Sequence, residues 1–321
     1  MLRLRYCQNM LTVVMVLMSR LGNFFIHRAS HENGKVTFEI GVDTHAPMLV
    51  NAFTESLDDV AHLTINYSAA DIVLQSTDRS ELTVREYMLV DEASYYAHVK
   101  HEDDTLAIIA GERPARDNLN IRIELEIPTT YHGRLEISSV SGPIEIDNLH
   151  KLRSLAITST SGAISLDDVE TSSLSIDSIT GTIKGRSLTA DDYTINAMSG
   201  NVHLMNTRGN YSVRCSAGSL RLDDAHGHGR FEVTSGTAKL CFAEVDGNLS
   251  AESSAGSVRL QVPRELDYGF NLETSIGSLK TPDNAHYSNN ERNYQTGAIG
   301  DPSDLMISMM TVVGSLALET R

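Results

Sequence analysis

Tryptophan is absent from this chain of 321 residues, and aromatic residues of all kinds make up only 6% of it. A platform that stacks sugars or nucleic-acid bases on aromatic rings normally uses more of them, so such a platform is not favoured. Positive charge is also scarce, since 26 lysines and arginines stand against 42 aspartates and glutamates, a formal net charge of −16. This balance argues against nucleic acid, which needs a basic footprint, and against adhesion to an anionic membrane by charge alone. An acidic surface is compatible with solubility and with cationic partners such as basic peptides.

Cysteine is scarce as well, with Cys7, Cys215 and Cys241 at unrelated spacings. An odd number without a repeated spacing fits neither a disulfide framework nor a zinc site. Phosphate-binding glycine loops, Ser-His-Asp arrangements and nucleotide fingerprints are missing too, so the sequence predicts no cofactor.

The first 34 residues follow no repeat. Arg3 and Arg5 precede an apolar run, 10–18, that resembles the charged and apolar regions of a signal peptide. No small-x-small cleavage site follows, and the run is too short to span a bilayer. The segment is interpreted as a weak export signal or membrane-associating segment, a short helix or capping segment, or an extension upstream of the true start.

A repeated glycine governs the rest of the chain. The series comprises Gly142, Gly162, Gly181, Gly200, Gly218, Gly236, Gly256 and Gly277, in steps of 20, 19, 19, 18, 18, 20 and 21 residues, and Gly314 follows after 37. A fixed period of this size is typical of stacked repeat architectures. Apolar residues alternate on both sides of each glycine, for example Ile157 before and Ile164 after Gly162. Alternation is the period of a half-buried strand.

The parity of the inward residues changes at each glycine, which a straight strand cannot do. We therefore interpret these nine as corner glycines, at positions where the backbone takes a positive φ that glycine adopts without steric strain. Small residues one and three positions before them, such as Ser161 and Ser159, are interpreted as a narrow inner edge. The sequence predicts an all-β solenoid of about 19 residues per coil, with two short strands per coil, coils roughly 4.8 Å apart and a right-handed path.

Three regions follow from the pattern. Residues 1–34 lie outside the repeat, residues 35–131 form an irregular β cap with opening coils, and residues 132–321 form regular coils. Within the last region, 282–304 break the period as an irregular loop. Residues 305–320 resume it, and because the chain ends there we expect them to form the terminal coil.

Two segments carry a family resemblance. The stretches 157–166, ITSTSGAISL, and 213–222, VRCSAGSLRL, resemble the bacterial putative-adhesin family of β-strand repeat proteins, DUF4097. The similarity extends over about 35–320, including the looser stretch 65–74, INYSAADIVL. The resemblance implies a bacterial source and a β-solenoid, transfers no catalytic residue, and includes members that look like envelope-stress components.

The densest group of potential ligands is Asp223, Asp224, His226 and His228. Imidazole and carboxylate together could hold a transition metal, but aspartate and glycine are also ordinary turn residues. An outward column that ends in Glu232, Glu252 and Glu273 is a candidate acidic binding strip, against the simpler account of a solvated face.

Carbohydrate-active β-helix enzymes need paired carboxylates at a fixed separation. Glu145 and Asp147 lie outward on one coil and recur in part as Ser165 and Asp167, without an evident acid partner. The sequence therefore favours a non-enzymatic, adhesin-like binding or structural module of the bacterial cell envelope or exterior, with a protein, peptide or glycan as partner. Two alternatives stay open: an envelope-stress sensor that binds cationic peptides through an acidic face, and a carbohydrate-active enzyme.

Overall fold

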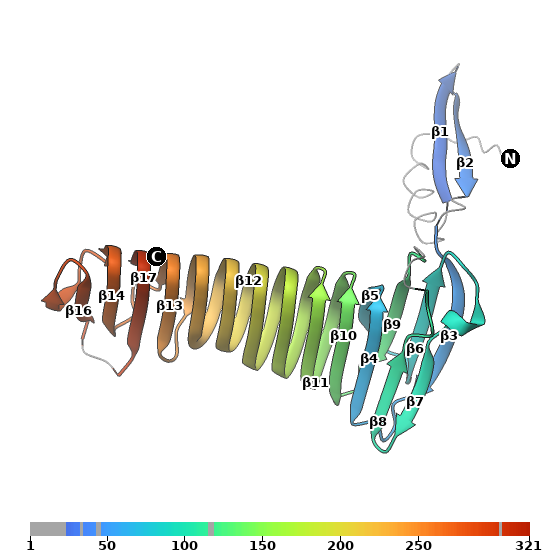
Figure 1. Ribbon diagram of the computed structural model, residues 1–321, viewed down its shortest axis with the longest axis horizontal. Coiled ribbons are helices and arrows are strands. Elements are labelled where there is room, and N and C mark those ends of the chain that lie inside the picture. The colour runs from blue at the N-terminus through green and yellow to red at the C-terminus, as the bar shows by residue number, and fades with distance from the viewer. Residues whose placement is uncertain (1–23, 33–34, 43–45, 115–118, 302–303) are drawn as a thin grey trace.

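The computed structural model describes residues 24–32, 35–42, 46–114, 119–301 and 304–321, and its regular structure is almost entirely strand. One short 3-10 turn, η2 (Ala93–Tyr95), interrupts the described part. In chain order the strands are β1 (Phe24–Glu32), β2 (Lys35–Val42), β3 (Met48–Ser56), β4 (His62–Ala69), β5 (Asp71–Thr77), β6 (Glu81–Met88), β7 (His98–Glu102), β8 (Thr105–Ile109), β9 (Arg122–Pro128), β10 (Arg134–Ser141), β11 (Ile144–Ser161), β12 (Ile164–Glu244), β13 (Leu249–Val262), β14 (Tyr268–Lys280), β15 (His286–Asn290), β16 (Tyr294–Ile299) and β17 (Met306–Thr320). Strands β3 to β17 belong to one hydrogen-bonded sheet that winds into a long rod (Figure 1).

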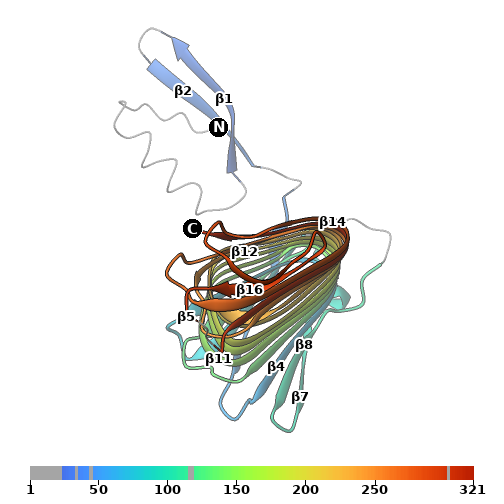
Figure 2. The ribbon, with the colours of Figure 1, turned by 90° about the vertical axis from the view of Figure 1, so that its left-hand side faces the viewer.

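The rod consists of stacked coils whose like positions pair in parallel. Leu135 pairs with Leu155, and Leu155 pairs with Leu174 one coil further on. Seen along the rod, the coils superpose as a flattened ring (Figure 2). The predicted all-β solenoid is confirmed. Strand β12 runs for 81 residues past four corner glycines, so the two short strands expected in each coil are not separate elements there. The right-handed path stays a prediction.

The core is the thin interior of the coils. In the coil of Gly200, the inward residues Tyr193, Ile195, Val202 and Leu204 are all almost fully buried. Stacking therefore buries a continuous apolar strip that no single coil could bury alone.

The predicted inner edge is only half correct. Residues three before the corner glycines are buried, as at Ser159 and Cys215, whereas those one before are exposed, as at Ser161 and Ala217. The backbone turns outward between the two positions, which removes the second residue from the interior.

Eight of the nine corner glycines have a left-handed backbone, with φ between 108° at Gly142 and 150° at Gly314, and Gly277 does not share this conformation. A Cβ on Gly200 would collide with the carbonyl oxygen of Gly181 in the neighbouring coil. A second corner lies six residues after the glycine. There the left-handed positions belong to Asn148, Asp168, Ser187, Asn206 and Asp224, which are mostly the residue types that tolerate this conformation.

The last coils do not stack in sequence order. Strand β17 pairs in parallel with β13 on one side and with β14 on the other. The corner glycines agree, because Gly314 lies against Gly256, and Gly277 lies against Gly314. The expectation that 305–320 form the terminal coil is therefore wrong. Strand β17 is inserted between the coils of β13 and β14, and β14 with the antiparallel strands β16 and β15 forms the end of the rod.

The other end is also permuted. Strands β4 and β5 lie between β8 and β9 on one side and β10 and β11 on the other. Beyond β8 and β9 the pairing turns antiparallel: β6 pairs with β9 and β3, and β7 pairs with β8.

Strands β1 and β2 form a separate antiparallel hairpin. The predicted signal-like run at 10–18 lies outside the described residues. Within the described part of the chain, no helix has the length and apolar character needed to cross a membrane.

Candidate functional site

A fully buried carboxylate lies in the cap formed by β3, β6 and β7. Glu86, on β6, accepts hydrogen bonds from Asn51 Nδ2 at 2.9 Å, from the Ala97 backbone N–H at 2.7 Å, from Arg113 Nη2 at 2.7 Å and from the Tyr67 hydroxyl at 3.2 Å. These donors come from four different segments of the chain, so one carboxylate ties the cap together.

Arg113, the cation that pairs with Glu86, is also buried. The Arg113 side chain is only 7% exposed, its Nε donates to the Tyr95 carbonyl oxygen at 2.9 Å, and its guanidinium lies over the Tyr67 ring at 5.2 Å. Burial raises the pKa of Tyr67 far above its ordinary value, with a further rise from the Glu86 charge. Because both oxygens of Glu86 are occupied and the phenol stays neutral, the arrangement serves to hold structure and has no free base to offer.

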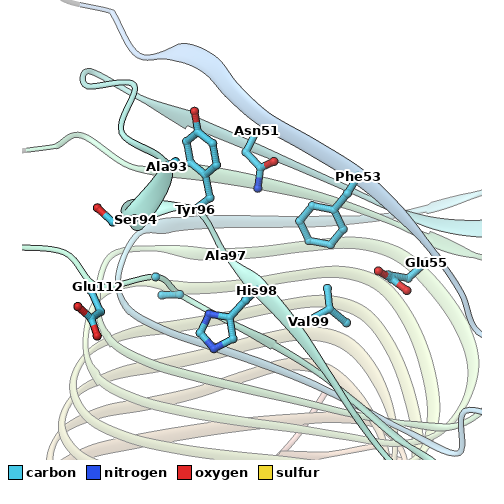
Figure 3. Close-up of a pocket in the computed structure, with 12 residues that line it drawn as sticks. Asn51, Phe53, Glu55, Ala93, Ser94, Tyr96, Ala97, His98, Val99 and Glu112 are labelled. Atoms are coloured by element: carbon cyan, nitrogen blue, oxygen red, sulfur yellow. The ribbon is translucent and has the colours of Figure 1, made fainter.

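Beside this pair lies a pocket of about 800 Å³ between β3 and the segment from η2 to β7 (Figure 3). Asn51, Phe53 and Glu55 line it from β3, and His98 and Val99 line it from β7. A contact of 3.3 Å between His101 Nε2 and Glu55 Oε2 bridges the two strands. The pocket is open and of mixed polarity, which fits a surface groove in the cap.

The four residues of the predicted ligand cluster do not converge. Asp223 is held by His203 at 2.8 Å and by Arg221 at 2.5 Å. Asp224 pairs with Arg321 at 2.8 Å from the end of the chain.

The two histidines turn to other carboxylates. His226 contacts Glu244 at 3.2 Å, and His228 contacts Asp246 at 2.8 Å. Across the part of the chain that the structure describes, no three His, Cys, Asp or Glu side chains are grouped as metal ligands. Asp224 also has a structural reason to be there, because it occupies the second corner of its coil.

Several carboxylates on the faces of the rod are paired with cations of the same or a neighbouring coil. Burial acts to raise the pKa of Asp223, but the hydrogen bonds from Arg221 and His203 outweigh it and lower that pKa. The pKa of Glu319 is lowered mainly by its hydrogen bond from Lys280. These carboxylates are therefore ionised well into the acid range.

The candidate acidic strip is broken. Glu232 and Glu252 are neighbours in the ladder, and Arg230 bridges both of them at 2.6 and 3.1 Å. Met310 of the inserted β17 stands between Glu252 and Glu273. The prediction of a continuous acidic column is wrong, because it assumed that the coils stack in sequence order.

Asp147 and Asp167 are neighbours in register, one ladder step apart. Arg186 binds Asp167, and this hydrogen bond lowers the pKa of that carboxyl. A glycosidase pair needs one carboxylic acid whose pKa is raised so that it can donate a proton. The arrangement around Asp167 acts in the opposite direction.

Sequence reasoning missed Glu86 and Arg113. The signal for Glu86 was available, since it falls on the inward parity shared by Leu82, Val84 and Met88. A carboxylate at such a position requires a partner, but nothing in the pattern identifies Arg113, which lies in the connection after β8.

Comparison with known proteins gives one family and several solved structures. The family model described as Toastrack DUF4097 matches residues 60–309. A putative adhesin from Parabacteroides distasonis is similar at 11% identity and a TM-score of 0.42, covering 84% of this chain and 96% of its own. A putative adhesin from Bacteroides fragilis is similar at 12% identity and a TM-score of 0.38, with the same coverages of 84% and 96%. No curated protein matches the sequence.

Proposed function

This chain belongs to the Toastrack family DUF4097, and from that premise we propose that it is a non-enzymatic, adhesin-like binding or structural module of the bacterial cell envelope. The observation that carries the proposal is the ladder itself. Like positions of successive coils form straight columns of side chains, and eight steps between nine corner glycines span about 38 Å at roughly 4.8 Å per step. Such a long, regular surface suits a linear partner better than a small substrate.

The chemistry of the described acidic groups supports a binding role. Glu232, Glu244 and Glu319 each have a lowered pKa because a cationic or imidazole neighbour donates a hydrogen bond to them. General acids and bases are instead tuned toward the working pH. Glu86, the most buried carboxylate, already accepts four hydrogen bonds.

The alternative of a cationic-peptide sensor depended on a continuous acidic column. With Met310 inside that column and Arg230 bridging two of its members, this face offers a peptide little free negative charge. A sensor of this kind would show salt-sensitive binding of basic peptides, and a carbohydrate-active enzyme would show turnover of a glycan; either result with the purified chain would contradict the proposal.

The test uses the native host. A strain that lacks the gene is compared with strains that carry the wild-type gene or a variant with Leu222→Asp, which places a charge at a fully buried position and destroys the coil stack. We expect the protein in the envelope or medium, and we expect attachment to glycan-coated surfaces to fall in the deletion strain and to return only with the wild-type gene. Recovery of the protein solely in the cytoplasm, or undiminished attachment without it, would contradict the proposal.

A further inference from the structure

One face of the rod carries a column of cations on an otherwise acidic protein. The column occupies the position three residues after each corner glycine from Gly181 onward. In spatial order its members are Lys184, His203, Arg221, Lys239, Arg259, Ala317 and Lys280. Lysine and arginine supply 26 of 321 residues in the chain but five of these seven positions, so the column concentrates positive charge that is scarce elsewhere.

The register of this cation column is fixed by main-chain pairing and by the stacked glycines. Lys239 pairs with Arg259, Arg259 with Ala317, and Ala317 with Lys280. Within β12, Gly236, Gly218, Gly200 and Gly181 stack on one another, so the same register holds back to Lys184. Six ladder steps of about 4.8 Å place the two end lysines roughly 29 Å apart.

Neighbouring carboxylates neutralise the column only in part. Asp223 lies beside His203 and Arg221, and Glu319 lies 2.8 Å from Lys280 and 3.9 Å from Arg259. Lys184 and Lys239 are exposed and, within the described residues, form no ion pair. Five lysines and arginines against two carboxylates leave the face with a net positive charge, which is concentrated at Lys184, Lys239 and Arg259.

A second column runs parallel to the first, two residues earlier on the same face. Each of its members is a short hydroxyl or amide residue: Thr182, Asn201, Ser219, Thr237, Ser257, Ser315 and Ser278. All of them are exposed or half-exposed, and the Ser219 hydroxyl already bonds to Asn201 Oδ1 at 2.8 Å across a coil. This hydroxyl column offers donors and acceptors beside every charge.

The two columns together point to one class of partner. We propose that this face binds a linear polysaccharide that carries a carboxylate on its sugar residues, with the carboxylates on the cation column and the sugar hydroxyls on the hydroxyl column. One pyranose residue is about as long as one ladder step, so successive sugars can meet successive coils. A single-stranded nucleic acid would stack its bases on aromatic side chains, and neither column contains one.

This inference rests on the proposed function and names the ligand class of the binding module. Charge-assisted contacts at an exposed surface are screened by salt, so binding is expected to weaken as ionic strength rises. Each cation is expected to contribute about two- to fivefold to the affinity, from the free energies typical of exposed ion pairs.

The test measures binding of the purified full chain to polygalacturonate, with neutral galactan and polyphosphate as comparison polymers. The column variant combines Lys184→Gln, Lys239→Gln and Arg259→Gln. A control variant with the same net charge combines changes away from the face: Lys100→Gln, Arg134→Gln and Arg292→Gln. We expect the column variant to lose tenfold or more in affinity for polygalacturonate and the control variant to change by less than about twofold.

A third variant, Thr237→Val with Ser257→Ala, tests the hydroxyl column without changing charge. It is expected to weaken binding of polygalacturonate several-fold and to leave the weaker binding of polyphosphate unchanged. Equal losses in the column and control variants, tighter binding of polyphosphate, or no binding of polygalacturonate would each overturn the inference. If cells with the column variant still attach like the wild type, the ligand assignment fails while the binding module stands; if the wild type itself confers no attachment, the proposed function fails.

Discussion

The insertion of β17 between β13 and β14 can be tested with two pairs of cysteines. Glu252 and Met310 are directly paired in the ladder, one step of about 4.8 Å apart, whereas Glu252 and Glu273 lie two steps apart, about 9.6 Å. A disulfide requires Cα atoms roughly 4.4–6.8 Å apart. We expect Glu252→Cys with Met310→Cys to form a disulfide under mild oxidation, and Glu252→Cys with Glu273→Cys to stay reduced.

The background for both pairs replaces the three native cysteines by alanine, and the disulfide is assigned by peptide mass spectrometry under non-reducing conditions. The bridge between positions 252 and 310 closes a loop of about 58 residues, which on the chain-entropy estimate stabilises the fold by up to about 4 kcal/mol. Urea unfolding with and without reductant measures this gain. If the coils stacked in sequence order, the second pair would cross-link and the first would not, and that outcome would refute the threading.

Three further predictions concern the coil stack and the cap. Gly200→Ala places a Cβ against the Gly181 carbonyl at a left-handed position and should cost about 3 kcal/mol in urea unfolding, while Ser199→Ala, exposed beside it, should cost little. Arg113→Met leaves the Glu86 carboxylate buried without its cation and should destabilise the protein by about 3–5 kcal/mol, a claim that fails if the loss is below 1 kcal/mol. Carboxylates with lowered folded-state pKa values stabilise the protein above their unfolded pKa near 4. The free energy of unfolding should therefore fall as the pH drops below about 4, and these carboxylates should contribute no change between pH 6 and 8.

The period of the repeat predicted the solenoid because stacking demands like residues at like positions. The same regularity hides the order of the coils. Each coil presents the same register to its neighbours, so β17 fits between β13 and β14 as readily as it would fit at the end. Position 310 shows the consequence: a methionine that the sequence places beyond Glu273 lies between Glu252 and Glu273.

The cap shows a different limit. In β6, Glu86 shares the inward parity of Leu82, Val84 and Met88, and this parity is readable from the sequence. Its partners are not, because Tyr67, Ala97 and Arg113 come from separate segments that meet only after the cap has folded. The four residues of the predicted ligand cluster do not converge for the related reason that neighbours in sequence at a corner contact different coils.

The permuted ends explain why binding should take place along the side of the rod. An open end of a coil stack exposes unpaired strand edges, which invite further strands. Here the antiparallel strands β3, β6 and β7 cover one end and β15 with β16 cover the other, while β17 has both of its edges paired. Strands β7 and β15 are only five residues long, so they offer a short edge to any further strand, and the lateral columns are the extended surface. The cation column in turn depends on the threading, because Ala317 of β17 joins Arg259 to Lys280. A truncation before β17 would therefore shorten the binding face and also open the core. Loss of binding in such a truncation could come from lost ligand contacts or from unfolding. The charge substitutions leave the coils intact and so test the ligand contacts alone.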